Sequence, residues 1–293
     1  MTTQVQAGAA LTQTVQRLAA AGVDTPRLDA ELLLAHILGR SRAGLLAHPE
    51  QILTPGQLAR LHDLAARRAA RQPLAYLTGS RWFFGREFAV TPAVLIPRPE
   101  TELLVELALP WLAARGQTGA SVVDVGVGSG AIIISLAAAA VGRFDFHACD
   151  LSPAALAVAQ ANAARHGVGD RIHFHQGDLL APLPGPVDLI LANLPYVGED
   201  ERESLMPEVR EHEPALALFS GPHGLHLIQR LLAQAPAYLR AGGCLLLEIG
   251  SGQAAAVAEL AGAAFPAAQI TCHPDLAGHD RVLHIQTAPT PDT

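Results

Sequence analysis

The sequence predicts an α/β fold: a mainly parallel sheet covered by helices on both faces, preceded by a small helical domain. Two observations carry this prediction. From residue 121 onward, short apolar runs alternate with helical runs at a spacing typical of parallel sheets. Before that, residues 11–71 show helical patterns throughout. No internal repeat or low-complexity linker is visible in the sequence.

The composition is that of a globular protein with unevenly distributed charge. The 293 residues are half hydrophobic and carry a net charge of −7. Residues 1–86 hold ten Arg against five acidic residues, whereas residues 87–293 hold ten Arg against twenty-two. This asymmetry fits either an N-terminal module that meets an anionic partner or a solvated Arg face on its helices. Since neither a membrane span nor a signal peptide is visible, we expect a cytoplasmic protein without membrane partners. The sequence does not specify an oligomeric state, and we expect a monomer rather than an oligomer.

In the N-terminal part, the clearest helix signal is Thr54 followed by Pro55, an N-cap and a first-turn proline. The helix is expected over residues 57–71, ended by Pro73, and it carries four arginines: Arg60, Arg67, Arg68 and Arg71.

The next segment changes character. Strand-like runs at residues 88–90 and 94–96, with a turn signal at Thr91-Pro92, predict a β-hairpin that links two domains. A helix is expected over residues 101–114. We therefore expect a helical domain (1–80), a hairpin linker (81–99), an α/β domain (100–287) and a disordered tail (288–293).

Seven strand-like runs follow, with helical runs between most of them. They lie at residues 121–125, 144–149, 171–175, 187–192, 244–249, 269–271 and 281–285. Such alternation makes the carboxyl ends of the strands the expected ligand-binding edge.

A glycine-rich turn follows the first of these strands. Gly126, Gly128 and Gly130, with Val127 and Ser129 between them, lead directly into a helix. Glycines allow a tight turn and close approach of a ligand, and free N–H groups at the helix start can bind an anionic group such as a carboxylate. Dinucleotide enzymes use a related G-x-G-x-x-G turn. The G-x-G-x-G spacing, the preceding Asp124 and the later motifs favour S-adenosylmethionine.

Two acidic residues end the next strands. Asp150 comes 20 residues after Gly130, which places it to accept hydrogen bonds from ribose hydroxyls. Asp178 follows the third strand and is expected to accept from the adenine amino group, with Leu179 packed on the ring. His173 and His175 share a strand face, but no third ligand accompanies them, so the sequence predicts no metal site.

The motif Asn193-Leu194-Pro195-Tyr196 directly follows the fourth strand. An amide nitrogen is a poor nucleophile because its lone pair is delocalised into the carbonyl group. Two acceptors that hold both N–H groups can orient this nitrogen toward a methyl donor. The Asn193 side-chain oxygen and the Leu194 carbonyl are the expected acceptors, since Pro195 holds residue 194 extended. Tyr196 is expected to pack on the planar amide, and Asn193 also to border the cofactor.

These motifs resemble those of the peptide chain release factor glutamine methyltransferases, and the resemblance covers nearly the whole chain. It includes residues 71–79, 84–88, 94–102, 208–210, 213–214, 248–250, 275–278 and 280–281. It implies a small N-terminal helical domain and a seven-stranded, Rossmann-like (class I) S-adenosylmethionine-dependent methyltransferase domain. It further implies methylation of the glutamine in the Gly-Gly-Gln tripeptide of release factors, which the N-terminal arginines would help to dock.

Two positions depart from the usual family pattern: Leu194 stands where the family has Pro, and Val127 where it often has Thr. A residue that contributes only a carbonyl at position 194 tolerates the change.

Three alternatives remain open from the motifs alone. Glutamine methylation of a ribosomal protein would use the same catalytic residues. N6-adenine methylation of nucleic acid uses a similar motif, but it needs a positive face beside the site, and the methyltransferase half is acidic. A nicotinamide-dependent oxidoreductase or a nucleotide-binding module would leave Asn193 to Tyr196 unexplained.

Overall fold

The structure is a computed structural model and describes residues 4–289, so most of the predicted tail, from residue 290, lies outside the described residues. Contacts divide the chain into two compact units. The smaller unit contains Met1–Ser80 together with Met206–His212, and the larger contains Arg81–Leu205 and Glu213–Thr293. No helix among the described residues is long and apolar enough to cross a membrane.

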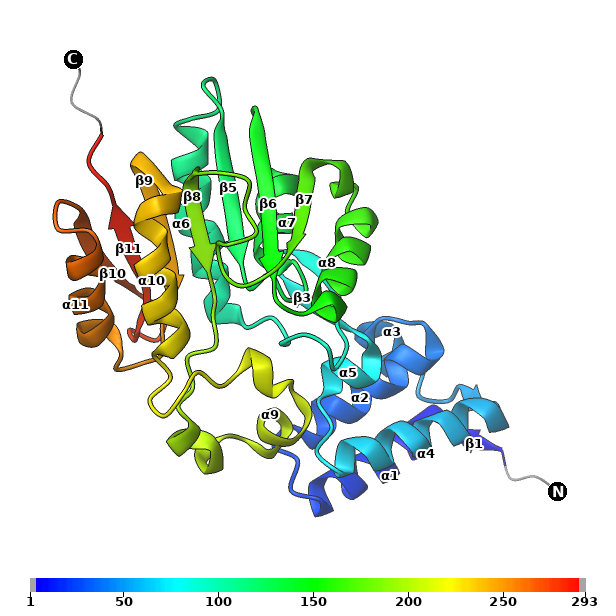
Figure 1. The fold of residues 1–293 in the computed structure, drawn as a ribbon. Helices are drawn as coiled ribbons and strands as arrows, with labels where there is room; N and C mark the ends of the chain where they lie inside the picture. The colour runs from blue at the N-terminus through cyan, green and yellow to red at the C-terminus, as the bar shows by residue number, and fades with distance from the viewer. Residues whose placement is uncertain (1–3, 290–293) are drawn as a thin grey trace. The chain divides into compact units, whose positions relative to one another are not determined.

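The smaller unit is a helical cluster (Figure 1). Its elements are β1 (Val5–Gln6), α1 (Ala7–Ala20), α2 (Pro26–Leu38), α3 (Arg42–Leu46), β2 (Ile52–Leu53), α4 (Pro55–Ala69), α5 (Leu74–Thr78) and α9 (Pro207–His212). Helix α4 begins as predicted, with the Thr54 side chain accepting from Gln57 N and the Gln57 side chain accepting from Thr54 N. The expectation that residues 11–71 are helical throughout is wrong at Ile52–Leu53, which pairs antiparallel with Val5–Gln6.

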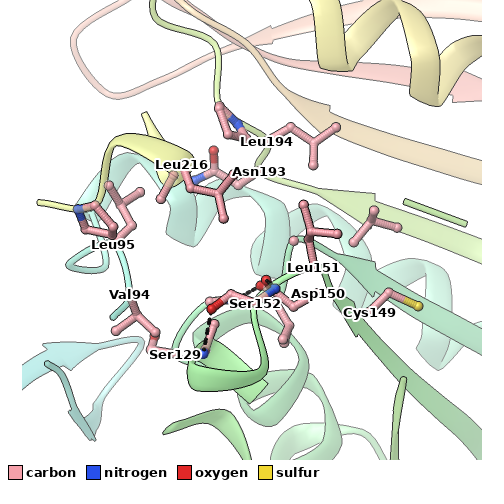
Figure 2. A pocket seen from close by; sticks show the side chains of 18 of the residues that line it. Val94, Leu95, Ser129, Cys149, Asp150, Leu151, Ser152, Asn193, Leu194 and Leu216 are labelled. Atoms are coloured by element: carbon pink, nitrogen blue, oxygen red, sulfur yellow. Dashed lines mark hydrogen bonds between the residues drawn. The ribbon is translucent and has the colours of Figure 1, made fainter. Parts of the chain in front are cut away.

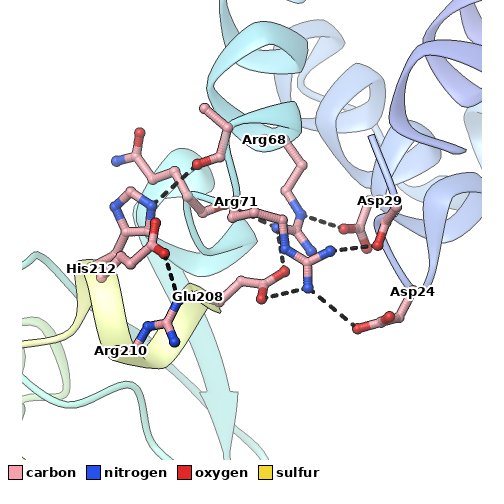
Figure 3. Close-up of polar contacts among 11 residues, drawn as sticks. Asp24, Asp29, Arg68, Arg71, Glu208, Arg210 and His212 are labelled. Carbon is pink, nitrogen blue, oxygen red and sulfur yellow. Dashed lines mark hydrogen bonds and ion pairs between the residues drawn. The ribbon is translucent and has the colours of Figure 1, made fainter. Parts of the chain in front are cut away.

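The arginines of α4 and the turn after it do not form one solvated face. Arg68 is buried, and it donates to Asp29 (2.6 Å) and Glu208 (2.9 Å), while Arg71 donates to the other Glu208 oxygen (2.8 Å) (Figure 3). Arg60 is exposed and Arg67 is half-buried; both form ion pairs with Asp63, and Arg67 also donates to Gln72 Oε1 (2.9 Å). The expectation that all four dock a partner is therefore wrong for Arg68 and Arg71, because these two hold α9 against the helical unit.

The predicted hairpin exists, but its turn lies elsewhere. Strands β3 (Ser80–Phe83) and β4 (Arg86–Ala89) pair across Phe84 and Gly85, whose φ angles are +47° and +69°. Two consecutive positive φ angles form the two-residue turn that best matches strand twist. Residues 94–96, predicted as a strand, are irregular, and the Ile96 N–H donates to Glu213 Oε2 (3.1 Å) instead of a neighbouring strand.

The larger unit contains the predicted seven-stranded sheet, in the order β10-β11-β9-β8-β5-β6-β7. Every strand is parallel to its neighbours except β11, which runs antiparallel to β9 and β10. The strands are β5 (Ala120–Val125), β6 (Phe144–Asp150), β7 (Ile172–Gln176), β8 (Val187–Ala192), β9 (Leu239–Glu248), β10 (Gln269–Pro274) and β11 (Asp280–Gln286). The helices are α6 (Glu102–Ala113), α7 (Ala131–Ala139), α8 (Pro153–Arg165), α10 (His226–Tyr238) and α11 (Ala254–Ala264).

Alternation along the strands builds a core on each face of the sheet. Val122 packs with α6, α7 and α8, whereas the next residue, Val123, packs with α10 and α11. On β8, Leu189 packs on the same face as Val122, and the next residue, Ile190, packs on the same face as Val123. The result is a three-layer unit, and α10 and α11 are seen on one face of the sheet in Figure 1.

The strand order sets the position of the site. After β5 the chain adds β6 and β7 on one side, then crosses over to add β8 and β9 on the other. Ligands of such sheets bind where the order reverses, outside the carboxyl ends of the strands. Val125 pairs with Ala192, so the loops that leave β5 and β8 start side by side at this point.

Candidate active site

A cavity of about 340 Å³ opens at the carboxyl ends of the central strands (Figure 2). This size is typical of small-molecule sites. Its walls come from the loops after β5, β6, β7 and β8, from residues 93–101 and 214–217, and from α10. The predicted site residues that line it are Gly126, Val127, Gly128, Ser129, Asp150, Asp178, Leu179, Asn193, Leu194 and Pro195. Gly130 and Tyr196 are not among the lining residues.

The glycine-rich loop owes its shape to positive φ angles. Gly126, Gly128 and Gly130 have φ of +76°, +53° and +83°. A Cβ on Gly130 would stand 2.5 Å from Ile134 Cδ1, so only glycine fits at the start of α7. The amides of Gly126 and Val127 both donate to Cys149 O, at 2.9 and 3.0 Å. These two amides are therefore engaged within the loop, and the donors left for an anionic group belong to the start of α7.

Asp150 is the last residue of β6 and fixes the glycine loop. Its Oδ2 accepts from Gly128 N (3.0 Å) and its Oδ1 accepts from Ser152 N (2.8 Å). Ser152 in turn caps α8, since its hydroxyl accepts from Ala155 N. A carboxylate oxygen can accept more than one hydrogen bond, so each retains capacity toward the cavity.

Asp178 has a partner that the sequence did not indicate. Arg230 on α10 forms an ion pair with it, and both residues line the cavity. Leu179, buried next to Asp178, has a φ of +52°, which is uncommon for a residue with a branched side chain. The strained turn places an apolar side chain and a paired carboxylate together at this end of the cavity.

Asn193 and Leu194 form the opposite wall. Asn193 Nδ2 donates to the buried Thr101 hydroxyl oxygen (3.0 Å), which fixes the orientation of the amide and leaves Asn193 Oδ1 as an acceptor. The Leu194 side chain is 3% exposed, and its Cδ2 lies 3.1 Å from where a Cβ on Gly126 would stand. Leu194 therefore packs directly over the first glycine of the cofactor loop.

Tyr196 points into the protein. Its ring packs against the core beneath α10 and α11, and its hydroxyl donates to Glu248 Oε1 (3.2 Å). Burial raises the pKa of the Tyr196 phenol, and the negative Glu248 raises it further. Burial also raises the pKa of the Glu248 carboxyl to about 7, although the Thr101 hydroxyl and Arg281 favour its ionised form. The expectation that Tyr196 packs on a substrate amide is not supported by this placement.

A second buried acid lies behind the glycine loop. Asp124 is fully buried on β5, and neither carboxylate oxygen has a hydrogen-bond partner among residues 4–289. Burial, together with the charge of Asp150, raises its pKa to about 7. Cys149 lines the cavity nearby, but burial raises the pKa of its thiol to about 12, so it remains neutral and is no nucleophile.

The histidines of β6 and β7 cluster away from this cavity. His147 shares a short contact with His175 (2.9 Å) and pairs with Asp145, which also contacts His173. Within residues 4–289, no group of three or more such side chains is arranged to hold a metal ion.

Comparisons with known proteins identify the family. Residues 9–79 match a family model described as PrmC N-terminal domain, and residues 122–212 match one described as Methyltransferase domain. A release factor glutamine methyltransferase from Cereibacter sphaeroides is 46% identical over 95% of this chain and 98% of its own. One from Deinococcus radiodurans is 42% identical over 95% and 97%. The chain belongs to the release factor glutamine methyltransferase family.

A solved structure supports the fold of the larger unit. The catalytic domain of hMettl16, in complex with MAT2A 3'UTR hairpin 6, superposes with a TM-score of 0.55 and covers 83% of this chain and 87% of that one. At 14% identity this likeness concerns the fold alone. The predicted class I methyltransferase fold with an N-terminal helical domain is confirmed, and the enzyme depends on S-adenosylmethionine.

Several residues of the site were not predicted from the sequence. Thr101, Arg230 and Glu248 each contact a predicted residue from 52 to 92 positions away in the chain. Arg98, in the cavity wall, forms an ion pair with the buried Glu213. Only the sequence resemblance, which covers residues 94–102, 213 and 248, pointed to any of them.

Proposed function

We propose that this enzyme transfers the methyl group of S-adenosylmethionine to the side-chain amide nitrogen of the glutamine in the Gly-Gly-Gln motif of release factors. The observation that carries the proposal is the position of Asn193 and Leu194 in the wall of the same cavity as the glycine-rich loop. A planar amide held there lies beside the methyl donor. We expect this reaction in the cytoplasm, where release factors act.

The cavity suits the cofactor for three reasons. Its size, about 340 Å³, and its largely apolar wall fit a nucleoside. The glycine backbone at positions 126 and 128 carries no side chain that would block close approach. Two carboxylates line it, with Asp150 suited to ribose hydroxyls and Asp178 to an amino group. Val127, Ser129 and Leu179 would complete the binding wall, and Gly130 supports the loop from outside it.

The bound cofactor supplies an activated methyl group on a positively charged sulfur. The protein's part is then to position the amide, with no strong general base required. Asn193 Oδ1 and the Leu194 carbonyl would accept the two N–H groups of the glutamine amide. When the nitrogen–methyl bond forms and the sulfur–methyl bond breaks, the sulfur becomes neutral and one of these two protons would leave to solvent. Pro195 holds Leu194 extended, and Thr101 holds Asn193. Tyr196, whose hydroxyl is bound to Glu248, would support the loop from behind.

Two arginines of α4 would form a docking face for an acidic release factor. Arg60 and Arg67 are available for this role, whereas Arg68 and Arg71 are held in the helical unit. The acidic character of residues 87–293 does not favour a nucleic-acid substrate.

The test is methyl transfer from labelled S-adenosylmethionine to a purified release factor, with the release factor whose Gly-Gly-Gln glutamine is changed to Ala as control. We expect label on the first protein and none on the second. Equal labelling of both, or labelling of neither, contradicts the substrate assignment.

A further inference from the structure

Glu248 is a buried acidic residue of the larger unit to which the proposed reaction assigns no role of its own. It is the last residue of β9 and is 1% exposed. On the neighbouring strand β8, Ala192 pairs with Leu247. The next residues along the two strands, Asn193 and Glu248, therefore lie at the same edge of the sheet. The buried carboxylate therefore lies directly behind the loop that contains Asn193.

The Tyr196 end of that loop contacts Glu248 directly, and the Asn193 end is linked to it through Thr101. Tyr196 donates its hydroxyl to Glu248 Oε1 (3.2 Å). Asn193 donates Nδ2 to Thr101 Oγ1 (3.0 Å), and the Thr101 hydroxyl in turn favours the ionised form of Glu248. A hydroxyl has a single proton to donate. If the Thr101 hydroxyl points its proton toward Glu248, its oxygen can only accept a hydrogen bond from Asn193. That arrangement requires Asn193 to present its amide nitrogen to Thr101 and its oxygen elsewhere.

The remaining charges around Glu248 do not neutralise it by direct contact. Arg281 on β11 is engaged by Asp275 (3.1 Å) and donates to Ile249 O (3.2 Å), so it favours the ionised carboxylate without bonding to it. Glu100 opposes that form. Glu248 Oε2 has no hydrogen-bond partner among the described residues. A buried carboxylate with incomplete partners is costly, and a neutral or apolar residue would stabilise the fold better.

We propose that Glu248 is a positioning residue for methyl transfer, which holds Tyr196 directly and Asn193 through Thr101, so that the Asn193 oxygen faces the glutamine amide. The proposal rests on the proposed function. It predicts that Glu248 contributes to kcat although it does not line the cavity.

The experiment compares Glu248→Ala, Glu248→Gln and the control Leu246→Val, a buried change two residues earlier on β9. Misplacement of a positioning group by about 1 Å reduces rates on the order of 100-fold, which is the loss of kcat we expect for Glu248→Ala. KM for the cofactor should change little. Glu248→Gln retains an oxygen that accepts from Tyr196 and should recover part of the lost rate. Leu246→Val should retain kcat.

The pH profile separates positioning from a purely structural role. Wild-type kcat should fall as the pH decreases through about 7, because protonated Glu248 no longer orients Thr101 as an acceptor toward Asn193. This inflection should be missing in Glu248→Gln. The proposal is overturned if Glu248→Ala has wild-type kcat, if it loses no more than Leu246→Val, or if Glu248→Gln keeps the inflection.

A second readout does not depend on the substrate. The chain has three tyrosines, so the NMR signal of ring-labelled Tyr196 can be assigned with Tyr196→Phe. In the wild type this signal should titrate near pH 7, and in Glu248→Gln it should not. A signal that is identical in both proteins contradicts the Glu248 proposal even if methyl transfer to release factors is found. Titration without methyl transfer contradicts the proposed function and leaves the Glu248 contact established.

Discussion

Replacing Leu194 with Ala separates the two contributions of this residue, its buried side chain and its backbone carbonyl. The side chain is 3% exposed and packs over Gly126 and the core beneath α10. Leu→Ala removes three carbon groups, which at roughly 0.8 kcal/mol each contribute about 2.4 kcal/mol. The cavity left behind adds to this, and we expect the free energy of unfolding to fall by about 3 kcal/mol.

The catalytic effect of the same change should be small. Pro195 still holds residue 194 extended, so its carbonyl remains an acceptor for the substrate amide. At saturating cofactor, and at a temperature where the variant is folded, we expect kcat within about threefold of the wild type, less than 1 kcal/mol in the barrier. Urea denaturation and single-turnover methyl transfer measure the two effects.

Leu191→Ala is the matched control, because Leu191 is a buried leucine three residues earlier, on β8, that does not line the cavity. Both variants should lose similar stability and keep their kcat. A tenfold or greater loss of kcat in Leu194→Ala alone would refute the conclusion that position 194 acts through its backbone, and would explain why the family usually has Pro there.

Two further predictions concern buried charges. Asp124 has its pKa raised from 3.8 to about 7, so the folded state binds its proton more tightly and wild-type stability should fall by up to about 4 kcal/mol as the pH rises from 4 to 8. Asp124→Asn should lose the Asp124 part of this dependence in urea denaturation and keep the part that comes from Glu248, so an unchanged dependence on pH would contradict the prediction. Arg68→Ala removes the ionic partner of the buried Asp29 and leaves Glu208 paired with Arg71 alone, and it should cost about 3–5 kcal/mol. Arg60→Ala, at an exposed pair, should change stability by about 0.5 kcal/mol or less, and equal melting temperatures for the two variants would show that Arg68 is not structural.

The sequence predicted those parts of the fold that depend on local patterns. All seven strands of the sheet were located because apolar runs alternate with helices, and Thr54 was recognised as a helix cap from its local sequence. The hairpin was placed too late in the chain, because Phe84 adopts a left-handed conformation that its residue type does not favour. Thr91-Pro92 carried the stronger turn signal.

The site was predictable to the extent that it follows strand ends. Asp150, Asp178 and Asn193 meet at one cavity because parallel strands end at one edge. The partners of these residues were not predictable, because Thr101 and Arg230 reach them only through the tertiary fold. Charge patterns were misleading in the helical unit, where Arg68 is buried by acids distant in sequence.

Asn193→Ala tests most directly the claim that the Asn193 loop positions the glutamine amide. The measurement compares kcat on a release factor with the affinity for S-adenosylhomocysteine from calorimetry. Loss of the amide oxygen should lower kcat on the order of 100-fold, with cofactor affinity nearly unchanged. An equal loss in kcat and in affinity would mean that Asn193 binds the cofactor and does not hold the amide.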